Sequence, residues 1–125
     1  MEINKELKQV IVMRTDLNMR KGKMIAQGAH AAMMFALNII LTQDKPSADQ
    51  VAWVMQGMKK ITVRCESEDE LLDIEQRAKD ASLTVHIVTD SGHTEFHGIP
   101  TKTCLAIGPN KAESIDRITK TLKLL

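Results

Sequence analysis

The stretch KQVIVMRTDLNMRKGKMIAQGAHAAMMFALNIIL, residues 8–41, decides the fold class, because it predicts a buried strand followed by a long helix. Residues 8–14 are an apolar run with the length of a buried strand. The polar residues after it contain Gly22 and predict a turn. From about residue 21 to 41 the chain is rich in alanine and methionine, as in a helix. Small residues recur there at every fourth position, at Gly28, Ala32 and Ala36, so one face should pack closely against its neighbour.

The rest of the chain alternates further helices and strands without a linker or a repeat. Strands are predicted at 60–65, 83–89 and 102–107. Helix starts are predicted where a capping residue is followed three positions later by Glu or Gln, at Ser47 with Gln50, Ser67 with Glu70 and Asn110 with Glu113. The predicted order is βααβαββα. It indicates a single α/β domain over residues 1–125, with a four-stranded mixed β-sheet flanked by helices.

The composition is that of an ordinary water-soluble domain, with 43% hydrophobic and 26% charged residues. We expect no apolar run to reach the roughly 18–20 residues of a membrane span, and the first residues lack the apolar core of a signal peptide. The two cysteines are too few to indicate a disulfide framework. We therefore expect a cytoplasmic protein with no membrane partner.

The charges are unevenly distributed, although the net charge is only +1. Residues 1–30 carry six basic and three acidic side chains, residues 66–80 carry two basic and seven acidic, and residues 102–125 carry five basic and two acidic. Such asymmetry can focus a positive field on one side of the molecule. It is also what a solvated surface with charges matched to helix dipoles would give, and the charges alone favour this second interpretation.

The start of the long helix is the first candidate site. On a helix, Lys23, Gln27 and His30 are spaced i, i+4 and i+7, and therefore lie on one face. A cation, an amide and an imidazole in line near a helix N-terminus could bind an anion or transfer a proton. Arg20 and Lys21 add positive charge beside them. The alternative is an exposed polar stripe on an amphipathic helix.

The segment DSGHTEFHGIPT, residues 90–101, is the second candidate site. It is longer than most connections between strands, and long polar loops often carry function. Asp90 comes where a strand stops, so the sheet can hold its carboxylate rigidly. The alternative makes Asp90 and Gly92 ordinary turn residues and Thr94 a local backbone cap.

Metal binding and base stacking are both poorly supported. His93 and His97, with His30 or His86 as a third ligand, could be read as a metal site, but nothing ties their spacing to one element. We therefore expect no metal and no other cofactor. Only two Phe and one Trp are present and there is no Tyr, which argues against recognition of single strands by stacking.

These segments, in this order, resemble the type 2 peptidyl-tRNA hydrolase family. KGKMIAQGAHAA is similar to the family's helix start K-G-K-x-x-A-Q-x-x-H-A, and residues 90–94 are similar to its D-x-G-x-T loop. The resemblance covers almost the whole chain, including TKTCLAIGP at 101–109. It implies a four-stranded mixed sheet flanked by helices, a homodimer, and no cofactor. It also implies hydrolysis of the ester that joins a peptide to the 3′ end of tRNA, so that the tRNA is recycled.

The resemblance also implies which residues act. The catalytic candidates are Lys23, His30, Asp90 and Thr94. Asp90 would orient or deprotonate a water molecule, while Lys23 would stabilise the developing oxyanion or steer the terminal phosphate. Thr94 would hold Asp90 or the substrate. His30 could be the base, or it could be a buried structural residue. We favour the structural role. The substrate-binding candidates are Arg14, Arg20, Lys21, Gln27, His93 and Thr101.

The sequence departs from the family pattern at a few positions. Many members have D-A-G-R-T-Q where this chain has Ser91, His93 and Glu95, and Gly where it has Arg20. Loss of the loop arginine and gain of an acid should weaken attraction to phosphate at that edge, and Arg20 can compensate at the other. A catalytically altered adaptor that binds RNA or protein is the alternative function.

Overall fold

The computed structural model describes residues 5–93 and 96–125. Its elements are β1 (Leu7–Arg14), α1 (Lys21–Thr42), α2 (Ala48–Met55), β2 (Lys60–Cys65), α3 (Glu68–Asp80), β3 (Val85–Asp90), β4 (Thr101–Lys111) and α4 (Ala112–Thr119). The predicted order βααβαββα is confirmed. The fourth strand is longer than expected, because it continues beyond residue 107 to Lys111.

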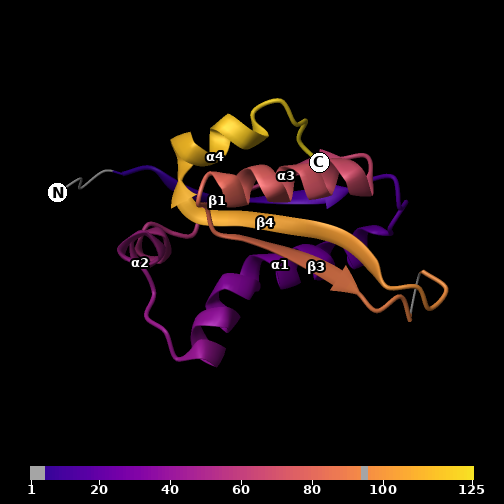
Figure 1. The fold of residues 1–125 in the computed structure, drawn as a ribbon, viewed down its shortest axis with the longest axis horizontal. Helices are drawn as coiled ribbons and strands as arrows, with labels where there is room; N and C mark the ends of the chain where they lie inside the picture. The colour runs from indigo at the N-terminus through magenta and orange to yellow at the C-terminus, as the bar shows by residue number, and fades with distance from the viewer. Residues whose placement is uncertain (1–4, 94–95) are drawn as a thin grey trace.

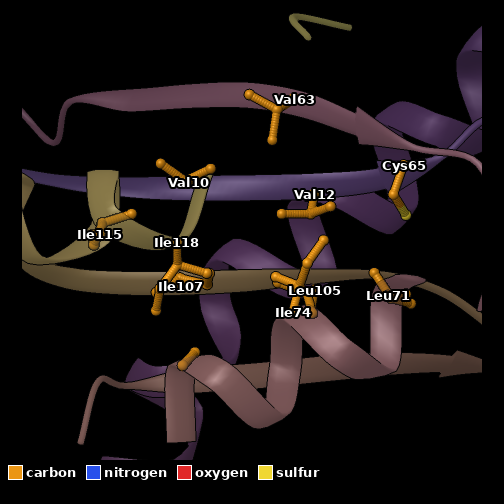
Figure 2. Packing of buried hydrophobic residues seen from close by; sticks show 11 residues of the cluster. Val10, Val12, Val63, Cys65, Leu71, Ile74, Leu105, Ile107, Ile115 and Ile118 are labelled. Carbon is orange, nitrogen blue, oxygen red and sulfur yellow. The ribbon is translucent and has the colours of Figure 1, made fainter. Parts of the chain in front are cut away.

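The four strands form one mixed sheet in the order β2-β1-β4-β3. β2 runs parallel to β1, whereas β4 runs antiparallel to both β1 and β3; Figure 2 shows the four side by side. The outer edge of β2 is covered by the last residues of the chain. The Arg64 N–H donates to the Lys123 carbonyl, and the Leu125 N–H donates to the Thr62 carbonyl. β3 forms the other edge.

Helices cover both faces of the sheet, so the domain has three layers (Figure 1). α3 and α4 pack on the face that carries Val10 and Val12 of β1, drawn in Figure 2. α1 packs on the opposite face, against Ile11 and Met13. This alternation along β1 is the period of two that a strand imposes on its side chains. α2 extends the α1 layer, where Trp53 packs edge-on against Phe35 with ring centroids 5.8 Å apart.

Helix α1 combines close packing with a largely apolar exposed side. Gly28 lies over Ile11 and Met13, as the predicted small face requires. The expectation that no segment has the length and hydropathy of a membrane span is wrong for α1: an 18-residue window of this helix has a mean hydropathy of 1.6, with 22% of it buried. Helices of water-soluble domains share this property, and α1 packs on the sheet through Gln27, Gly28, Ala31 and Phe35.

The helix starts confirm some capping predictions and correct one. Ser47 forms a reciprocal capping box with Gln50, and Ser67 accepts a hydrogen bond from the Glu70 N–H. The prediction that Asn110 caps the last helix is wrong. Its side-chain oxygen instead accepts the N–H of Thr84, 3.0 Å away, because β4 still pairs with its neighbours at this point.

Candidate active site

The carboxylate of Asp90 is the centre of a cluster formed by the end of β3, the first turns of α1 and the following loop. Its Oδ1 accepts hydrogen bonds from Lys23 Nζ at 2.9 Å and Gln27 Nε2 at 3.3 Å. Its Oδ2 accepts the backbone N–H of Gly92 at 2.9 Å. The side chains of Lys23 and Asp90 are 15% and 12% exposed, so the ion pair is mostly enclosed but reachable from solvent.

These donors fix the charge state of Asp90. The hydrogen bond from Lys23 lowers the pKa of the Asp90 carboxyl below its usual value, and the Gly92 N–H lowers it further, against the opposing effect of burial. Asp90 is therefore ionised at neutral pH. A carboxylate of low pKa is a weak proton acceptor, but it is a strong hydrogen-bond acceptor for a water molecule. Orientation of water suits it better than full deprotonation.

A buried threonine that sequence reasoning missed sets the orientation of Gln27. The Oγ1 of Thr103 donates to Gln27 Oε1 at 2.5 Å, and this leaves the amide nitrogen of Gln27 to face Asp90. Thr103 lies at a β-bulge: Val88 pairs with Cys104 and Thr89 pairs with Lys102, so Thr103 is the extra residue between them. Bulges re-aim side chains, and here the bulge directs a hydroxyl at α1.

The loop after Asp90 is closed tightly around Gly92. Gly92 has φ +83°, and a Cβ at this position would lie 2.2 Å from the Ile99 carbonyl oxygen. The Gly92 carbonyl also accepts the N–H of Gly98 at 2.8 Å. Only glycine fits this conformation and this close approach, so Gly92 places its own N–H against Asp90 Oδ2.

Arg14 is anchored inside the fold rather than offered to a ligand. It is 8% exposed, and its Nε and Nη2 donate to the two oxygens of Asp16 at 3.1 and 2.6 Å. Its Nη1 donates to the Lys102 carbonyl at 2.9 Å. The hydrogen bond and charge of Arg14 lower the pKa of the Asp16 carboxyl. Arg14 thus ties the loop before α1 to the start of β4 and positions both.

The other candidates are not gathered at Asp90. His30 is exposed, which corrects the buried structural role favoured from the sequence; within the described residues no hydrogen bond or ion pair engages it. His93 is exposed, and the Thr101 hydroxyl donates to the Ile99 carbonyl at 2.8 Å. Thr94 lies outside the described residues.

Two cationic candidates lie at the start of α1, away from Asp90. Arg20 is its exposed N-cap residue. Lys21 borders a groove of about 710 Å3 between α1, β1 and β2. Within the described residues, neither side chain forms a hydrogen bond with the Asp90 carboxylate.

Neither cysteine is suited to act as a nucleophile, because both are buried. Burial raises the pKa of the Cys65 and Cys104 thiols to about 11. The thiolate is the reactive form, so hydrolysis by way of a cysteine acyl-enzyme is disfavoured. In residues 5–93 and 96–125, no three His, Cys, Asp or Glu side chains gather as metal ligands.

Sequence comparisons relate this chain to known proteins. The profile of a family described as Peptidyl-tRNA hydrolase PTH2 matches residues 7–125. A peptidyl-tRNA hydrolase of Methanocaldococcus jannaschii is 44% identical over 119 residues, which cover 95% of this chain and 100% of that protein. One from Methanothermobacter thermautotrophicus is 43% identical over 95% of this chain and 100% of its own length. A probable peptidyl-tRNA hydrolase 2 of Dictyostelium discoideum is 43% identical over 95% of this chain and 55% of that protein.

Proposed function

This chain belongs to the PTH2 family of peptidyl-tRNA hydrolases, and we propose that its active site is the Asp90 carboxylate with Lys23, Gln27 and Thr103. The chain is a hydrolase that acts on the ester bond between a peptide and the 3′ end of tRNA. The observation that carries the site assignment is the convergence of three donors on the two oxygens of Asp90.

The reaction needs a positioned water and a positive group for the charge that develops on the carbonyl oxygen. Asp90 accepts a hydrogen bond from the attacking water and orients it toward the ester carbon. Lys23 is 2.9 Å from the same carboxylate, so its ammonium lies within reach of the oxyanion that forms. Thr94, for which the family resemblance implies a role, would hold the substrate.

The tRNA body is held through its phosphates rather than its bases. Arg20 and Lys21 are exposed at the start of α1, on the element that also supplies Lys23. Phosphates of the tRNA acceptor end would contact these side chains, so that the ester lies near Lys23 and Asp90. The reaction takes place in the cytoplasm, with no membrane partner and no cofactor.

A homodimer is part of the proposal. Most exposed large apolar side chains lie on or beside α1 and α2, namely Ile25, Met33, Leu37, Ile40, Leu41, Val51, Val54, Met55 and Met58. Exposed apolar surface of this extent marks interaction sites. The α1–α2 surface, as we call this set, also borders the 710 Å3 groove through Ile25, and we assign it to the second copy.

Sedimentation velocity tests the dimer. Ile40 is 68% exposed on the α1–α2 surface, so Ile40→Lys should convert the dimer to a monomer. Ile99 is 64% exposed in the loop after β3, and Ile99→Lys is the matched control that should leave the dimer intact. A monomeric wild-type protein, or equal effects of the two changes, would refute the assignment of this surface.

The substitution Asp90→Asn tests the active site with N-blocked aminoacyl-tRNA as substrate and a chelator present throughout. Loss of one preorganised electrostatic contact costs about 10²–10³-fold in kcat, so kcat should fall by about that factor. Among the described residues, the three hydrogen-bond partners of Asp90 are all donors. The new amide NH2 must therefore face one of them, and a loss of about 1.5–3 kcal/mol in unfolding free energy should follow.

Three outcomes would contradict the proposal. A kcat within a few-fold of the wild type would remove Asp90 from the chemistry and shift attention to His30. Wild-type activity that vanishes with chelator and returns with zinc would contradict a mechanism without metal. Loss of ester cleavage in the wild type, with RNA binding retained, would favour the adaptor alternative.

A further inference from the structure

The two edges of the sheet differ, and the open one leads to the active site. The outer edge of β2 is covered by residues 123–125. β3 is the terminal strand on the other side of the sheet that the described residues form. Proteins usually protect such an edge with lysine, proline or a covering segment. β3 has the sequence VHIVTD, with neither lysine nor proline, and its last residue is Asp90.

The backbone groups on this edge can be identified from the pairing with β4. The Gly108 N–H donates to the Thr84 carbonyl, and the Thr84 N–H donates to the side chain of Asn110 on β4, so both backbone groups of Thr84 point toward β4. Because the direction alternates along a strand, Val85, Ile87 and Thr89 direct their N–H and C=O groups outward. In the part of the chain that the structure describes, no hydrogen bond occupies these outward groups.

We propose that the open edge of β3 binds the peptide portion of the substrate as an added strand, which deepens the proposed function and rests on it. Peptides released by one hydrolase differ in side chains and share only their main chain. Main-chain hydrogen bonding to a sheet edge is the recognition mode that is insensitive to side chains. The continuity of this edge with Asp90 delivers the peptide to the carboxylate.

The chemistry of the edge favours a peptide over RNA as the occupant. Val85 and Ile87 are half-buried apolar residues, and β3 carries no lysine or arginine. Phosphate binding depends on such cations. The outward backbone groups of β3 alternate between N–H donors and C=O acceptors. Another peptide backbone offers the matching alternation of acceptors and donors.

The direction and reach of the bound peptide follow from the position of Asp90. The ester is at the C-terminus of the peptide and Asp90 is at the C-terminus of β3, so the peptide runs parallel to β3. In parallel pairing, a residue beside Val88 donates to the Ile87 carbonyl and accepts from the Thr89 N–H. If the esterified residue lies beside Asp90, the peptide residue beside Val88 is the third residue counted from the ester. The fifth is beside His86 and contacts Val85 and Ile87 in the same way, so recognition extends over about five residues.

The substrate-side test compares a series of substrates built on the same tRNA. One carries an N-acetylated aminoacyl group, and the others carry N-acetylated alanine peptides of two to seven residues. Because the acetyl carbonyl stands in for the carbonyl of the next residue, kcat/KM should rise as the peptide grows from one to three residues and again from three to five, by about two- to tenfold for each hydrogen bond, and then level off. Methylation of the amide nitrogen of the third residue should cancel the gain from that residue. A flat dependence on length, or no effect of the methyl group, would overturn the proposal.

The protein-side test uses Thr89, whose side chain is exposed. Thr89→Pro removes one outward N–H donor and breaks no hydrogen bond to β4. Edge-strand positions with an outward N–H tolerate proline. The ratio of kcat/KM for tripeptidyl- over N-acetylaminoacyl-tRNA should fall toward one. Thr89→Val keeps the N–H and should keep the ratio. The methylated substrate decides the question if the proline variant does not fold.

The remaining outcomes separate this inference from the proposed function. If the wild type hydrolyses none of these substrates, the proposed function fails. If it hydrolyses all at one rate, only the peptide-binding edge fails. If Thr89→Pro changes the sedimentation coefficient while the length dependence stays as in the wild type, the edge binds a second copy of the chain instead, and the proposal is wrong.

Discussion

The hydroxyl of Thr103 should be needed for both stability and turnover, because it sets the orientation of Gln27. Thr103→Val keeps the shape of the side chain and removes the donor. Gln27 is 3% exposed, so no bulk water can replace the 2.5 Å hydrogen bond to its Oε1. An unsatisfied buried acceptor costs about 1–3 kcal/mol. For a domain of this size, that corresponds to a melting temperature lower by about 3–6 °C per kcal/mol.

The effect on activity follows from the other end of the amide. Without the hydroxyl, the Gln27 amide can turn, so that its oxygen rather than its nitrogen faces Asp90 Oδ1, now 3.3 Å from Nε2. The carboxylate then loses one of three donors and gains a repulsive contact. We expect kcat to fall by about tenfold, which is the equivalent of one hydrogen bond of 1.4 kcal/mol.

Guanidinium unfolding and single-turnover release of N-acetylaminoacyl groups measure the two effects. Thr103→Ser keeps the hydroxyl and should recover most of both losses. Thr101→Val is the matched control, because the Thr101 hydroxyl donates only to the Ile99 carbonyl at the loop end. Should Thr103→Val match the wild type in unfolding free energy and in kcat, the orienting role of this hydroxyl would be wrong.

Two further predictions concern charge. The lowered pKa of Asp90 means that its contribution to stability is present above its unfolded pKa of about 3.9 and is lost as pH falls through the lower folded value. The difference in unfolding free energy between the wild type and Asp90→Asn should therefore be constant from pH 5 to 8 and shrink below about pH 4; a change centred near pH 6.5 would implicate a histidine instead. Lys21→Ala should reduce the dependence of log tRNA affinity on log salt by about one unit, whereas Lys79→Ala on the acidic helix α3 should leave it unchanged, and equal slopes for both variants would place Lys21 outside the phosphate path.

Local sequence signals predicted the elements well because their causes are local. The capping box of Ser47 is a contact between residues three apart, and the strand at 60–65 follows from alternation within six residues. Asn110 carries the same local signal, yet its side chain bonds to Thr84, 26 residues away. A long-range partner outcompeted the local one, and no window of neighbouring residues contains that partner.

The candidate site could be predicted only in part. Helical spacing and a strand end point to Lys23, Gln27 and Asp90, and the structure brings these three side chains into contact. Thr103 was missed, and Thr101 was chosen, because both carry a hydroxyl and only the bulge opposite Val88 distinguishes them. His30 is exposed, and within the described residues no hydrogen bond or ion pair joins it to the Asp90 cluster.

The covered edge of β2 limits how this domain can polymerise. A sheet with two open edges can add copies at both sides and grow into a fibril. Here residues 123–125 occupy one side, so any edge-to-edge pairing between copies must use β3 from each. Such a pairing is isologous and closes at two molecules. Aggregation by strand addition is thereby capped at a dimer, and it competes directly with the peptide for the same backbone groups.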